Sequence, residues 1–586
     1  MDNRRPLTEA ELLREADDAY ISSYESGESE FSSHETDSEI EETDTEEQED
    51  EHFDQSNVEE DHKDTENENT DRNKQYFFKK NKYEWSKIPP ASGKTRAENK
   101  IRSKIPAVIG EAYRNEPSKP VDSWNLLFDE HMLDIVVEHT NERITEMAAF
   151  YGDQALSCQF TNHTEKTELK AFIGLLLLSG AFKSHNEDVS SLWATNLTGR
   201  DIFRVTMTLK RFCFLRSALR FDDSSTRADG IQNGDKLAPI SELFNLMIVN
   251  SQSNYSCGEY MTIDEMLVGF RGRCRYKIYM PNEPNKYGLK IMCLCDAKTH
   301  YLLNAFIYAG KNSTSPNPRK LAVPTLNVLQ LVQPIINSNR NITGDNWFSS
   351  IELVKELKKC GLTYTGTLRK NKREIPTEFL PNKDHSALST MFGFTKDLTI
   401  LSYVPKKRKS VIMLSSLHHS DEIIQNEKRL PEIIDFYNST KGGLDSLDQK
   451  CACYNVGRRS RRWPLTLFFA MVNTMGVNAS VIYKSANNEN MDRRSFIVSV
   501  GGDLIMNHLK NRVTVQSLPT DLRALIKRHI GATVEASRVD IHVDNKKRRC
   551  YMCHSNNKHP HKCSVCQKGI CKSHSVNIVK CLNCTE

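Results

Sequence analysis

The sequence lacks the two features that direct a chain to a membrane. Its start has no basic stretch leading into an apolar one, which an export signal would need. The run AFIGLLLLSGAF, residues 171–182, is too short for a membrane span and is interrupted by glycine, so it suits a buried helix. We therefore expect an intracellular, soluble protein with no membrane partner.

The sequence also lacks a net charge of either sign, because its formal charge is only +2 over 586 residues. That balance hides two opposed parts. Residues 1–72 hold 28 acidic against 5 basic side chains, a local charge of −23, so residues 73–586 carry +25. The acidic tail has too little apolar surface to offset the entropy of ordering, and we predict that it is disordered. It can serve as a solubilising tail, or as a polyanion that competes with nucleic acid for the basic body.

A disulfide framework is missing from most of the chain. Nine of the sixteen cysteines are scattered between Cys158 and Cys453, as small core residues of an intracellular protein would be. The other seven crowd into the last 37 residues with one histidine, in the order C-x2-C-x9-C-x2-C-x4-C-x2-H-x6-C-x2-C. Four ligand pairs fit two structural, tetrahedral Zn²⁺ ions. The predicted ligands are Cys550, Cys553, Cys563, Cys566, Cys571, His574, Cys581 and Cys584.

The spacing leaves the zinc pairing open. The first ligand pair can join the third and the second the fourth, or neighbouring pairs can join in order. Directly before this module, KKRR at residues 546–549 is typical of a nuclear import signal or a nucleic-acid patch. Such a module can bind DNA, a histone tail or a ubiquitin-conjugating enzyme. A histidine in sixth place among eight ligands is unlike a RING ligase, whose histidine lies nearer the middle.

Hydrophobic periodicity divides the remaining chain into two kinds of structure. The apolar spacing is helical in residues 122–144, 166–182 and 207–221. From residue 260 to about 372 strands alternate with a helix, and GLKIMCLCDAKTHYLLNAFIYAG, residues 288–310, predicts two strands joined by a short turn. LTILSYVPKKRKSVIMLSS predicts a further hairpin with a basic turn. The fold class is therefore α/β, a mixed sheet with helices on it.

One acid lies where a strand seldom carries it. YMTIDEMLVGFRGRC has the composition of a strand, yet Asp264 is in its middle, and an unpaired buried carboxylate is costly. NITGDNWFSS puts Asp345 at the end of another strand. STKGGLDSLDQK puts Asp445 and Asp448 three residues apart after a Gly-Gly turn, and if it opens a helix both acids share one face.

Acids gathered in this way repel one another unless a cation lies among them. Hard divalent ions such as Mg²⁺ prefer oxygen ligands, and two of them can stabilise both oxygens of an in-line phosphoryl displacement. Taken singly, each aspartate also fits a structural role as a strand-end cap, turn former or helix N-terminal acid. The basic charge of the body favours the joint interpretation, because a phosphodiester substrate requires it.

Two further segments combine arginine with aromatic residues. RGRCRYK contains Arg271 and Arg273, and GRRSRRW contains Arg458, Arg459 and Trp463. This combination suits phosphates and unpaired bases, although solvated surface is the simpler interpretation. For Trp463, a core aromatic that anchors the following apolar helix is the alternative.

Six motifs together resemble one family. TIDEMLVGFRGRC, YMPNEPNKYGLKI, NITGDNWFSS, GTLRKNKREIP, YNSTKGGLDSLDQ and RRWPLTLFF are similar to motifs of the piggyBac family of DNA transposases and occur in that family's order. The acidic tail and the terminal cysteine cluster extend the resemblance from end to end.

The resemblance implies an RNase H-like catalytic core in which Asp264, Asp345 and Asp445 form the catalytic triad and Asp448 is a fourth acid. It implies a Mg²⁺-dependent reaction, for which Mn²⁺ can substitute, that nicks double-stranded DNA at the transposon terminal repeats. The freed 3′-hydroxyl then forms a hairpin on the opposite strand, and the opened end joins a TTAA target. A nuclear homodimer is implied as well.

The resemblance also assigns DNA contacts and domains. Arg369 and Lys372 match basic positions linked to target DNA, and Asn346 and Trp463 fall on motifs near the DNA. The implied domains are a disordered tail (1–72), a basic linker (73–119), a helical DNA-binding and dimerisation domain in two parts (120–258 and 456–535), a catalytic core in two parts (259–372 and 432–455), an insertion domain (373–431), a second linker (536–549) and the zinc module (550–586).

A domesticated relative is the alternative function. Such a protein would keep the fold and the zinc module and bind DNA in the nucleus without moving an element. All four acids are present in this sequence, which disfavours that alternative without removing it.

Overall fold

A computed structural model describes the chain at residues 76–78, 83–90, 106–151, 159–281, 283–310, 321–425, 427–531, 548–553, 558–559, 563 and 568–575. The predicted disordered tail, residues 1–72, lies outside the described residues. The chain divides into two compact units: the first comprises Met1–Asn186 and Cys213–Asp503, and the second comprises Glu187–Phe212 and Leu504–Glu586.

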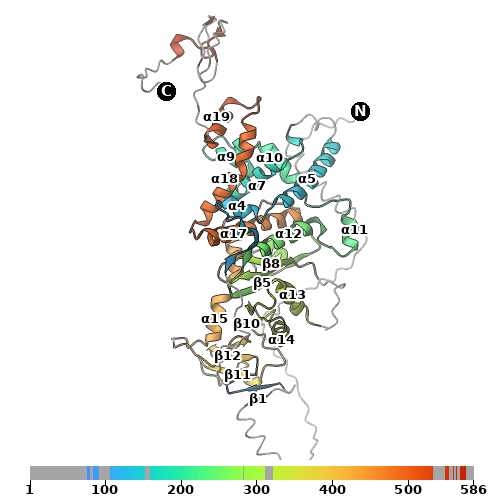
Figure 1. Cartoon of the computed structure of the whole chain (residues 1–586), viewed down its shortest axis with the longest axis vertical. Coiled ribbons are helices and arrows are strands. Elements are labelled where there is room, and N and C mark those ends of the chain that lie inside the picture. Colours follow the sequence, from blue (N-terminus) through green and yellow to red (C-terminus); the bar gives the residue numbers. More distant parts are fainter. Residues whose placement is uncertain are drawn as a thin grey trace, which may run out of the picture. The chain divides into compact units, whose positions relative to one another are not determined.

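The first unit is built on an eleven-stranded mixed sheet (Figure 1). Five neighbouring strands form its centre, in the order β8-β7-β5-β9-β10. β5 pairs antiparallel with β7 and parallel with β9, and β9 pairs parallel with β10. These strands are β5 (Tyr260–Gly269), β7 (Tyr287–Asp296), β8 (Leu302–Ile307), β9 (Asn341–Gly344) and β10 (Thr363–Thr367).

The central strands follow the predicted pattern, and the order is that of an RNase H-like core. β7 is buried along nine of its ten residues because it lies inside the sheet, with α13 (Val323–Leu331) and α16 (Gly443–Cys453) packed on it, and its sequence is correspondingly apolar. The predicted turn between β7 and β8 is confirmed. α14 (Ile351–Lys359) connects the parallel pair β9 and β10, as a parallel pair requires.

The segment between the two parts of the core extends the same sheet. β13 pairs with β10, β12 with β13, β11 with β12, and β2 with both β11 and β1. The predicted hairpin is confirmed as β12 and β13. These outer strands are β1 (Tyr76–Phe78), β2 (Glu84–Ser86), β11 (Thr390–Phe394), β12 (Thr399–Lys406) and β13 (Lys409–Ser415); β6 (Lys277–Tyr279) pairs with β7 at the other end of the sheet.

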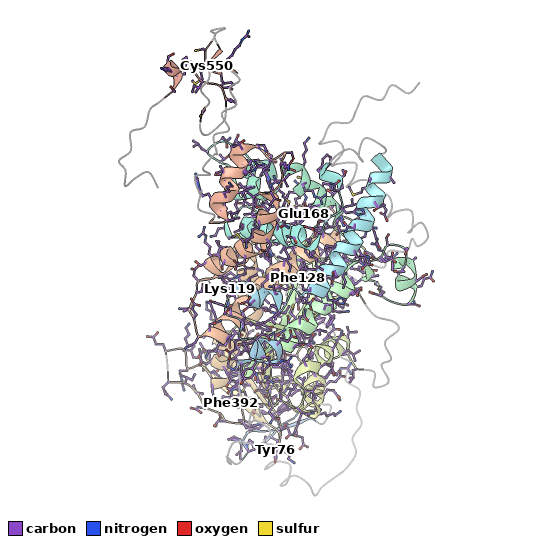
Figure 2. All side chains as sticks on the ribbon, turned by 45° about the horizontal axis from the view of Figure 1, so that its top comes forward. Tyr76, Lys119, Phe128, Glu168, Phe392 and Cys550 are labelled. Carbon is purple, nitrogen blue, oxygen red and sulfur yellow. The ribbon has the colours of Figure 1, made fainter. Side chains whose placement is uncertain are left out.

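Helices that precede the sheet in the sequence pack together with helices that follow it. α17 packs against α4, α12 and α16, so segments more than 200 residues apart share one core. Phe468 of α17 contacts the rings of Phe128 and Phe221, with centroids 6.3 and 4.8 Å away; Phe128 is labelled in Figure 2. The helices are α3 (Gly110–Arg114), α4 (Pro120–Asn125), α5 (Glu130–Tyr151), α7 (Lys166–Ala181), α10 (Leu209–Ala218), α11 (Arg227–Gln232), α12 (Ala238–Asn254), α15 (Glu432–Thr440), α17 (Trp463–Asn487) and α18 (Arg493–Arg512).

The helix predicted over residues 122–144 is two helices. α4 ends at Asn125 and α5 begins at Glu130. The Asp129 carboxylate accepts a hydrogen bond from the backbone N–H of Met132 at 2.9 Å, which caps a new helix. Apolar periodicity alone did not reveal this break because apolar residues continue across it.

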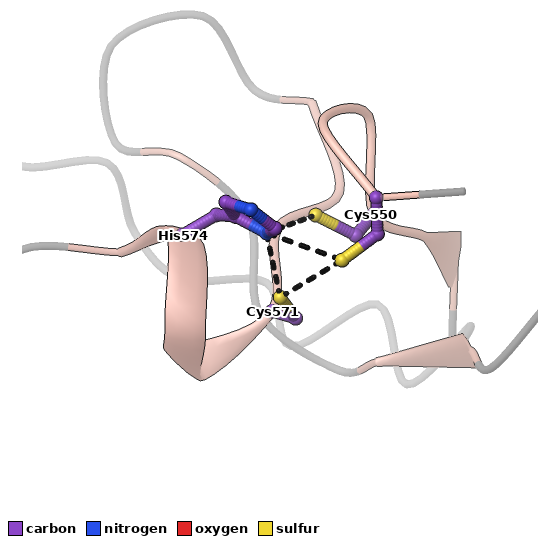
Figure 3. A group of neighbouring side chains, drawn as sticks. Cys550, Cys571 and His574 are labelled. Atoms are coloured by element: carbon purple, nitrogen blue, oxygen red, sulfur yellow. Dashed lines mark hydrogen bonds between the residues drawn. The ribbon is translucent and has the colours of Figure 1, made fainter. Parts of the chain in front are cut away.

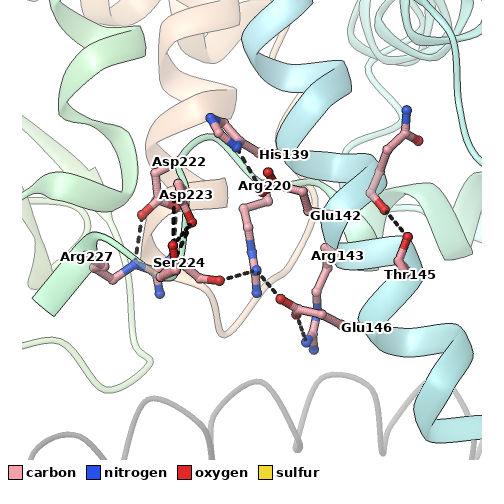
Figure 4. A network of polar contacts seen from close by, with 12 residues as sticks. His139, Glu142, Arg143, Thr145, Glu146, Arg220, Asp222, Asp223, Ser224 and Arg227 are labelled. Carbon is pink, nitrogen blue, oxygen red and sulfur yellow. Dashed lines mark hydrogen bonds and ion pairs between the residues drawn. The ribbon is translucent and has the colours of Figure 1, made fainter.

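A polar network fastens α5 to the chain that follows α10 (Figure 4). The Glu146 carboxylate receives Arg143 from its own helix at 2.9 Å and Arg220 at 3.1 Å. Asp222 accepts two hydrogen bonds from the Arg227 guanidinium, at 2.8 and 2.7 Å. Paired guanidinium and carboxylate groups of this kind hold a loop in one geometry.

α17 is, by length and composition, the one helix of the described residues that could cross a membrane. Within its most apolar window, 78% is buried inside the protein. Its contacts with α4, α12 and α16 account for this apolar character, as expected for the central helix of a helical body.

The second unit contains short helices and the cysteine-rich end. The Trp193 indole donates a hydrogen bond to the carbonyl of Met207 at 2.8 Å, and its ring contacts Phe203 and Phe212. Helices α9 and α19 pack together. Its elements are α8 (Val189–Leu192), α9 (Asp201–Thr206), α19 (Thr520–His529), β14 (Arg548–Arg549) and β15 (Lys558–His559).

Candidate functional site

Asp264 and Asp345 lie side by side on adjacent parallel strands. The register pairs Thr262 of β5 with Thr343 of β9. Two residues further along each chain come Asp264 and Asp345, and side chains two apart point to the same face of a sheet. Both aspartates are half-buried. The sheet therefore brings together two acids that are 81 residues apart in the sequence.

A threonine junction, which we define as Thr262, Thr343 and Thr440, joins these strands to the end of α15 (Glu432–Thr440), three residues before α16 begins. The Thr262 hydroxyl donates to the carbonyl of Thr440 at 2.7 Å, and the Thr343 and Thr440 hydroxyls hydrogen-bond each other at 2.8 Å. All three side chains are buried. A Cβ on Gly443 would come within 2.4 Å of the Thr262 hydroxyl, so only glycine lets α16 begin this close to β5.

α16 presents Asp445 and Asp448 in its first two turns. The predicted helix is confirmed, with Gly442 as its N-cap. Both carboxylates are exposed, and their spacing of three residues places them on one face. Because α16 packs against β5 and β7, Asp445 lies close enough to β5 to act on Asp264.

Electrostatic effects show that the acids share one region. Burial, the adjacent Glu265 carboxylate, and then Asp345 and Asp445 raise the pKa of Asp264 to about 8. Partial desolvation by the surrounding protein, and then the Asp445 charge, raise the pKa of Asp448 although its side chain reaches solvent. Charges act on one another in this way only over short separations, so the fold gathers like charges that water would otherwise keep apart.

Asp345 has cationic neighbours as well. Burial raises its pKa, while hydrogen bonds from the backbone N–H groups of Trp347 and Phe348 and the charges of Arg369 and Lys290 oppose the rise. The side chain of Asp345 is thus held beside both acids and bases, as is typical of a site that handles phosphate charge.

The donor set fits hard divalent cations. Asp264, Asp345, Asp445 and Asp448 offer only carboxylate oxygens, the ligands that Mg²⁺ and Mn²⁺ prefer. Among the described residues, no three of these acids have their oxygens within 4.8 Å of one another, as a closed cage around one ion would need. Two ions about 4 Å apart require a more open arrangement of acids.

Sequence reasoning missed two side chains at this site, Lys290 and Tyr437. Lys290 of β7 is buried, lies 3.3 Å from the Glu265 carboxylate and has its ammonium 4.7 Å from the centre of the Trp347 ring. Burial raises the pKa of the Tyr437 hydroxyl on α15. Asp345, Asp264 and Asp445 lie close enough to raise it further. A lone lysine inside the apolar strand YGLKIMCLCD was the signal that could have revealed Lys290.

Arg369 and Asn346 occupy the same edge of the sheet. The Arg369 guanidinium donates to the side-chain oxygen of Asn346 at 3.4 Å, and both side chains are exposed. Lys372 follows in the same loop and is half-buried. The structure therefore puts Arg369, which is 24 residues away in the sequence, beside Asp345 and its neighbour Asn346.

The cysteine-rich end contains one group with the geometry of a metal site (Figure 3). The ligand atoms of Cys550, Cys553, Cys571 and His574 all lie within 4.8 Å of one another. The His574 Nδ1 is 3.1 Å from the Cys553 sulfur and 3.2 Å from the Cys571 sulfur. Three thiols and one imidazole are a common tetrahedral zinc set.

This group joins the first predicted ligand pair to the third, which favours the interleaved scheme over pairing in order. The intervening chain contains Cys563, which the structure describes outside this group. Cys566, Cys581 and Cys584, the other predicted ligands of a second ion, lie outside the described residues.

Comparisons with known proteins agree with this geometry. A family model described as Transposase IS4 matches residues 119–480. The cryo-EM structure of a piggyBac transposase synaptic complex with hairpin DNA is similar over 82% of this chain and 100% of that chain, with a TM-score of 0.72 and 31% identity. The chain belongs to the piggyBac family of transposases.

Human relatives in the piggyBac family are more distant. PiggyBac transposable element-derived protein 3 is 24% identical over 60% of this chain, and PiggyBac transposable element-derived protein 2 is 25% identical over 43%. The matched regions span 60% and 44% of those proteins' lengths, less than two thirds of each.

In this piggyBac family member the segment GRRSRRW divides its arginines between the interior and the surface. Arg458 is buried and donates hydrogen bonds to the Ser184 carbonyl, at 2.7 Å, and to the Ser179 hydroxyl, at the end of α7. Arg462 is buried as well and donates to carbonyls of Ser217, at 2.8 Å, and Leu219, just beyond α10. Guanidinium groups in these positions donate hydrogen bonds to carbonyls that have no partner at the end of a helix.

The buried arginine changes one expectation from the sequence. We predicted a DNA contact for Arg458, but its guanidinium is inside the fold, whereas Arg459 is exposed. Trp463 is 7% exposed and begins α17, as the alternative of a core aromatic requires. The predicted interface therefore retains Arg459 from this segment.

The two arginine-rich segments of the transposase are neighbours in space. A Cβ on Gly272 would lie 2.9 Å from the carbonyl of Arg461, and the rings of Tyr276 and Trp463 meet edge to face with centroids 6.4 Å apart. Arg271 and Arg273 are exposed, as is Arg459. Two separate basic motifs thus contribute to one surface, which suits an extended polyanion better than either does alone.

Proposed function

We propose that this chain is a metal-dependent DNA transposase that cuts transposon ends through a hairpin intermediate and integrates at TTAA. The observation that supports this most is the β5–β9 register, which puts Asp264 and Asp345 level with each other, with Asp445 near enough to act on Asp264; only folding brings these side chains together. The family membership and the likeness to a transposase complex with hairpin DNA support it as well.

In this proposal the aspartates hold the divalent ions, and Asp448 is a fourth acid of the site. When bound, a pair of Mg²⁺ ions, or Mn²⁺ in their place, stabilises the attacking and leaving oxygens of phosphoryl transfer. Arg369 and Lys290 supply positive charge beside Asp345 and so bring a phosphodiester toward the acids. The threonine junction holds β5 and β9 to the end of α15, directly before α16, so the acids need little rearrangement when the substrate arrives.

The chemistry consists of successive displacements at phosphorus. Water attacks the phosphodiester at the transposon end, a new P–O bond forms, and the P–O3′ bond breaks to release a 3′-hydroxyl. That hydroxyl attacks a phosphodiester of the opposite strand, forms the hairpin and displaces the 3′-oxygen of the flanking DNA as a hydroxyl. A second water opens the hairpin, and the regenerated 3′-hydroxyl attacks the target strand. Each step exchanges one P–O bond for another, so no redox partner is needed.

A strand-transfer assay tests this proposal. DNA carrying the terminal repeats that flank the gene is incubated with the protein and Mg²⁺, and nicked, hairpin and joined products are resolved on a denaturing gel. We expect all three products from the native protein and none from Asp345→Ala. The matched control is Asp435→Ala, an exposed acid on α15 outside the site. Products that persist in Asp345→Ala, or their absence from the native protein, would refute the proposal.

The zinc-ligand group carries the second part of the proposal. We expect two structural Zn²⁺ ions per chain, one of them held by Cys550, Cys553, Cys571 and His574, and a cysteine-rich module that recognises the terminal repeats as part of a nuclear homodimer. Metal analysis of the purified protein tests the zinc, and light scattering tests the dimer. The domesticated alternative, which the names of the human relatives favour, predicts specific DNA binding without any strand transfer.

A further inference from the structure

The β12–β13 hairpin ends in four consecutive cations. Lys406 and Lys409 pair across the tip, and Lys407 and Arg408 form the turn between them. All four side chains are exposed. Arg408 has a φ of +64°, so the turn has a defined left-handed residue. The tip is therefore a fixed turn that displays positive charge.

The sheet register places this tip at the edge that carries Asp345. Gly344 of β9 is opposite Gly366 of β10, and Gly366 is opposite Leu414 of β13. Asp345, one residue further, is thus level with Met413. β13 runs antiparallel to β10, so Lys409 lies four residues beyond that level on the same side as Asp345, about 13 Å at roughly 3.3 Å per residue.

A second basic segment lies at this edge. The loop that begins at Arg369 leaves β10 directly after Leu368, whose N–H donates to the carbonyl of Ile412 on β13 at 2.8 Å. β10 and β13 are adjacent strands, so the loop and the hairpin tip extend from neighbouring positions. We define the basic ledge as the cations of both segments: Arg369, Lys370, Lys372, Arg373, Lys406, Lys407, Arg408 and Lys409.

We propose that the tip of the β12–β13 hairpin binds the phosphates of the duplex DNA whose scissile phosphate lies at the aspartates. β13 is two strands from β9, about 10 Å at the usual strand spacing, which puts the tip roughly 16 to 18 Å from Asp345. At about 3.4 Å per base pair, that distance corresponds to about five base pairs along the duplex. The inference rests on the proposed function for its substrate and adds a contact outside the catalytic site.

The residues PKKRK, 405–409, also match the composition of a nuclear import signal. The structure favours the DNA contact because the backbone of this segment is engaged in the hairpin ladder and in a left-handed turn. A short basic peptide that had to be bound in extended form would first have to leave the sheet, whereas phosphates can be bound by the turn as it is.

The salt dependence of DNA binding tests this proposal. The full-length protein binds a fluorescent duplex containing TTAA in EDTA, and the dissociation constant is measured across a salt series. The variant is Lys407→Ala with Arg408→Asn, because asparagine tolerates a left-handed φ. The matched control, Lys358→Ala with Lys359→Ala, removes two exposed cations from the last turn of α14, which precedes the start of β10 and so lies at the opposite edge of the sheet.

We expect the slope of log affinity against log salt to fall by about 1.8 in the tip variant, since each lost phosphate contact contributes about 0.9. The control should keep the native slope. Lys407→Glu, which leaves Arg408 in place, serves as a second variant if the first alters the melting temperature, and it should lower the slope by at least about 0.9.

An unchanged slope in both tip variants, or an equal loss in the control, would overturn the inference. A tip variant that binds DNA normally but no longer enters the nucleus would assign PKKRK to import and would overturn it as well. DNA binding in EDTA needs no catalysis. Failure of strand transfer in the native protein would therefore reject the proposed function, whereas the salt dependence of binding would still test the hairpin tip separately.

Discussion

Replacing Asp264 by asparagine tests the aspartate site through stability, without any DNA. The pKa of Asp264 is about 8, because the carboxyl is largely buried and lies near Glu265, Asp345 and Asp445. In the unfolded chain an aspartate has a pKa of about 3.9, so between these two values the folded protein binds more protons than the unfolded chain. The stability of the metal-free protein therefore falls as pH rises from about 4 to 8.

The magnitude follows from the shift. About four pKa units correspond to an upper limit of roughly 5 to 6 kcal/mol at 1.36 kcal/mol per unit. Relaxation and partial hydration of a half-buried carboxyl reduce this, and we expect about 2 to 3 kcal/mol near pH 8.5. In EDTA, Asp264→Asn should match the native protein near pH 4 and below, and exceed its stability by that amount at the higher pH. Urea unfolding followed by tryptophan fluorescence measures the difference.

Divalent ions provide the second half of this test. Mg²⁺ or Mn²⁺ should stabilise the native protein at pH 8.5, because the ions replace the repulsion between ionised acids with attraction, and should have little effect on Asp264→Asn. Asp435→Asn, an exposed acid on α15, is the control and should behave like the native protein in every condition. Parallel pH curves for the native protein and Asp264→Asn, or equal stabilisation of both by Mg²⁺, would refute the reasoning.

Three further predictions concern other parts of the chain. Arg458→Met should lower the free energy of unfolding by about 2 to 4 kcal/mol, because buried carbonyl acceptors lose a charged donor, while Arg459→Ala should weaken DNA binding without that loss. Cys553→Ser, or chelation of zinc, should unfold the cysteine-rich module and weaken binding to the terminal repeats while the first unit keeps its melting transition. Arg369→Ala with Lys372→Ala should reduce integration more than excision, because both residues match positions that the family resemblance links to target DNA.

Each of these has a contrary outcome. If Arg458→Met is as stable as the native protein but binds DNA more weakly, Arg458 contacts DNA and does not stabilise the fold. A Cys553→Ser protein with unchanged zinc content would remove this cysteine from the ligand group. Equal loss of excision and integration in the double variant would show that Arg369 and Lys372 act in DNA cleavage and not only in binding target DNA.

Local patterns predicted most individual elements of the core. The alternation and turn residues of GLKIMCLCDAKTHYLLNAF identified β7 and β8, and the Gly-Gly pair identified the start of α16, because these signals depend only on neighbouring residues. The break between α4 and α5 was missed, since the Asp129 cap interrupts an apolar pattern that continues on both sides. The zinc pairing could not be read either, because several groupings of four pairs satisfy the same spacing.

The arginines show the same limit in a functional setting. Arg458 and Arg459 are neighbours in one basic motif, yet one is buried at a helix end and the other is exposed. Composition cannot separate them, because the difference depends on where α7 ends in space. Lys290 was overlooked for a related reason: its importance comes from Glu265 and Trp347, which lie beside it only in the folded sheet.

By itself, the sequence determined the kinds of structure and the family, and it predicted the four acids and the eight zinc ligands, since each of these is recorded in residue types and short spacings. The tertiary structure alone decided that Asp264 and Asp345 are level at adjacent parallel strands, that Cys550 and Cys553 group with Cys571 and His574, and that a basic hairpin tip lies at the edge of the sheet that carries Asp345. The reason is physical: register and packing set distances between residues that are far apart in the chain, and these distances decide which charges act on one another.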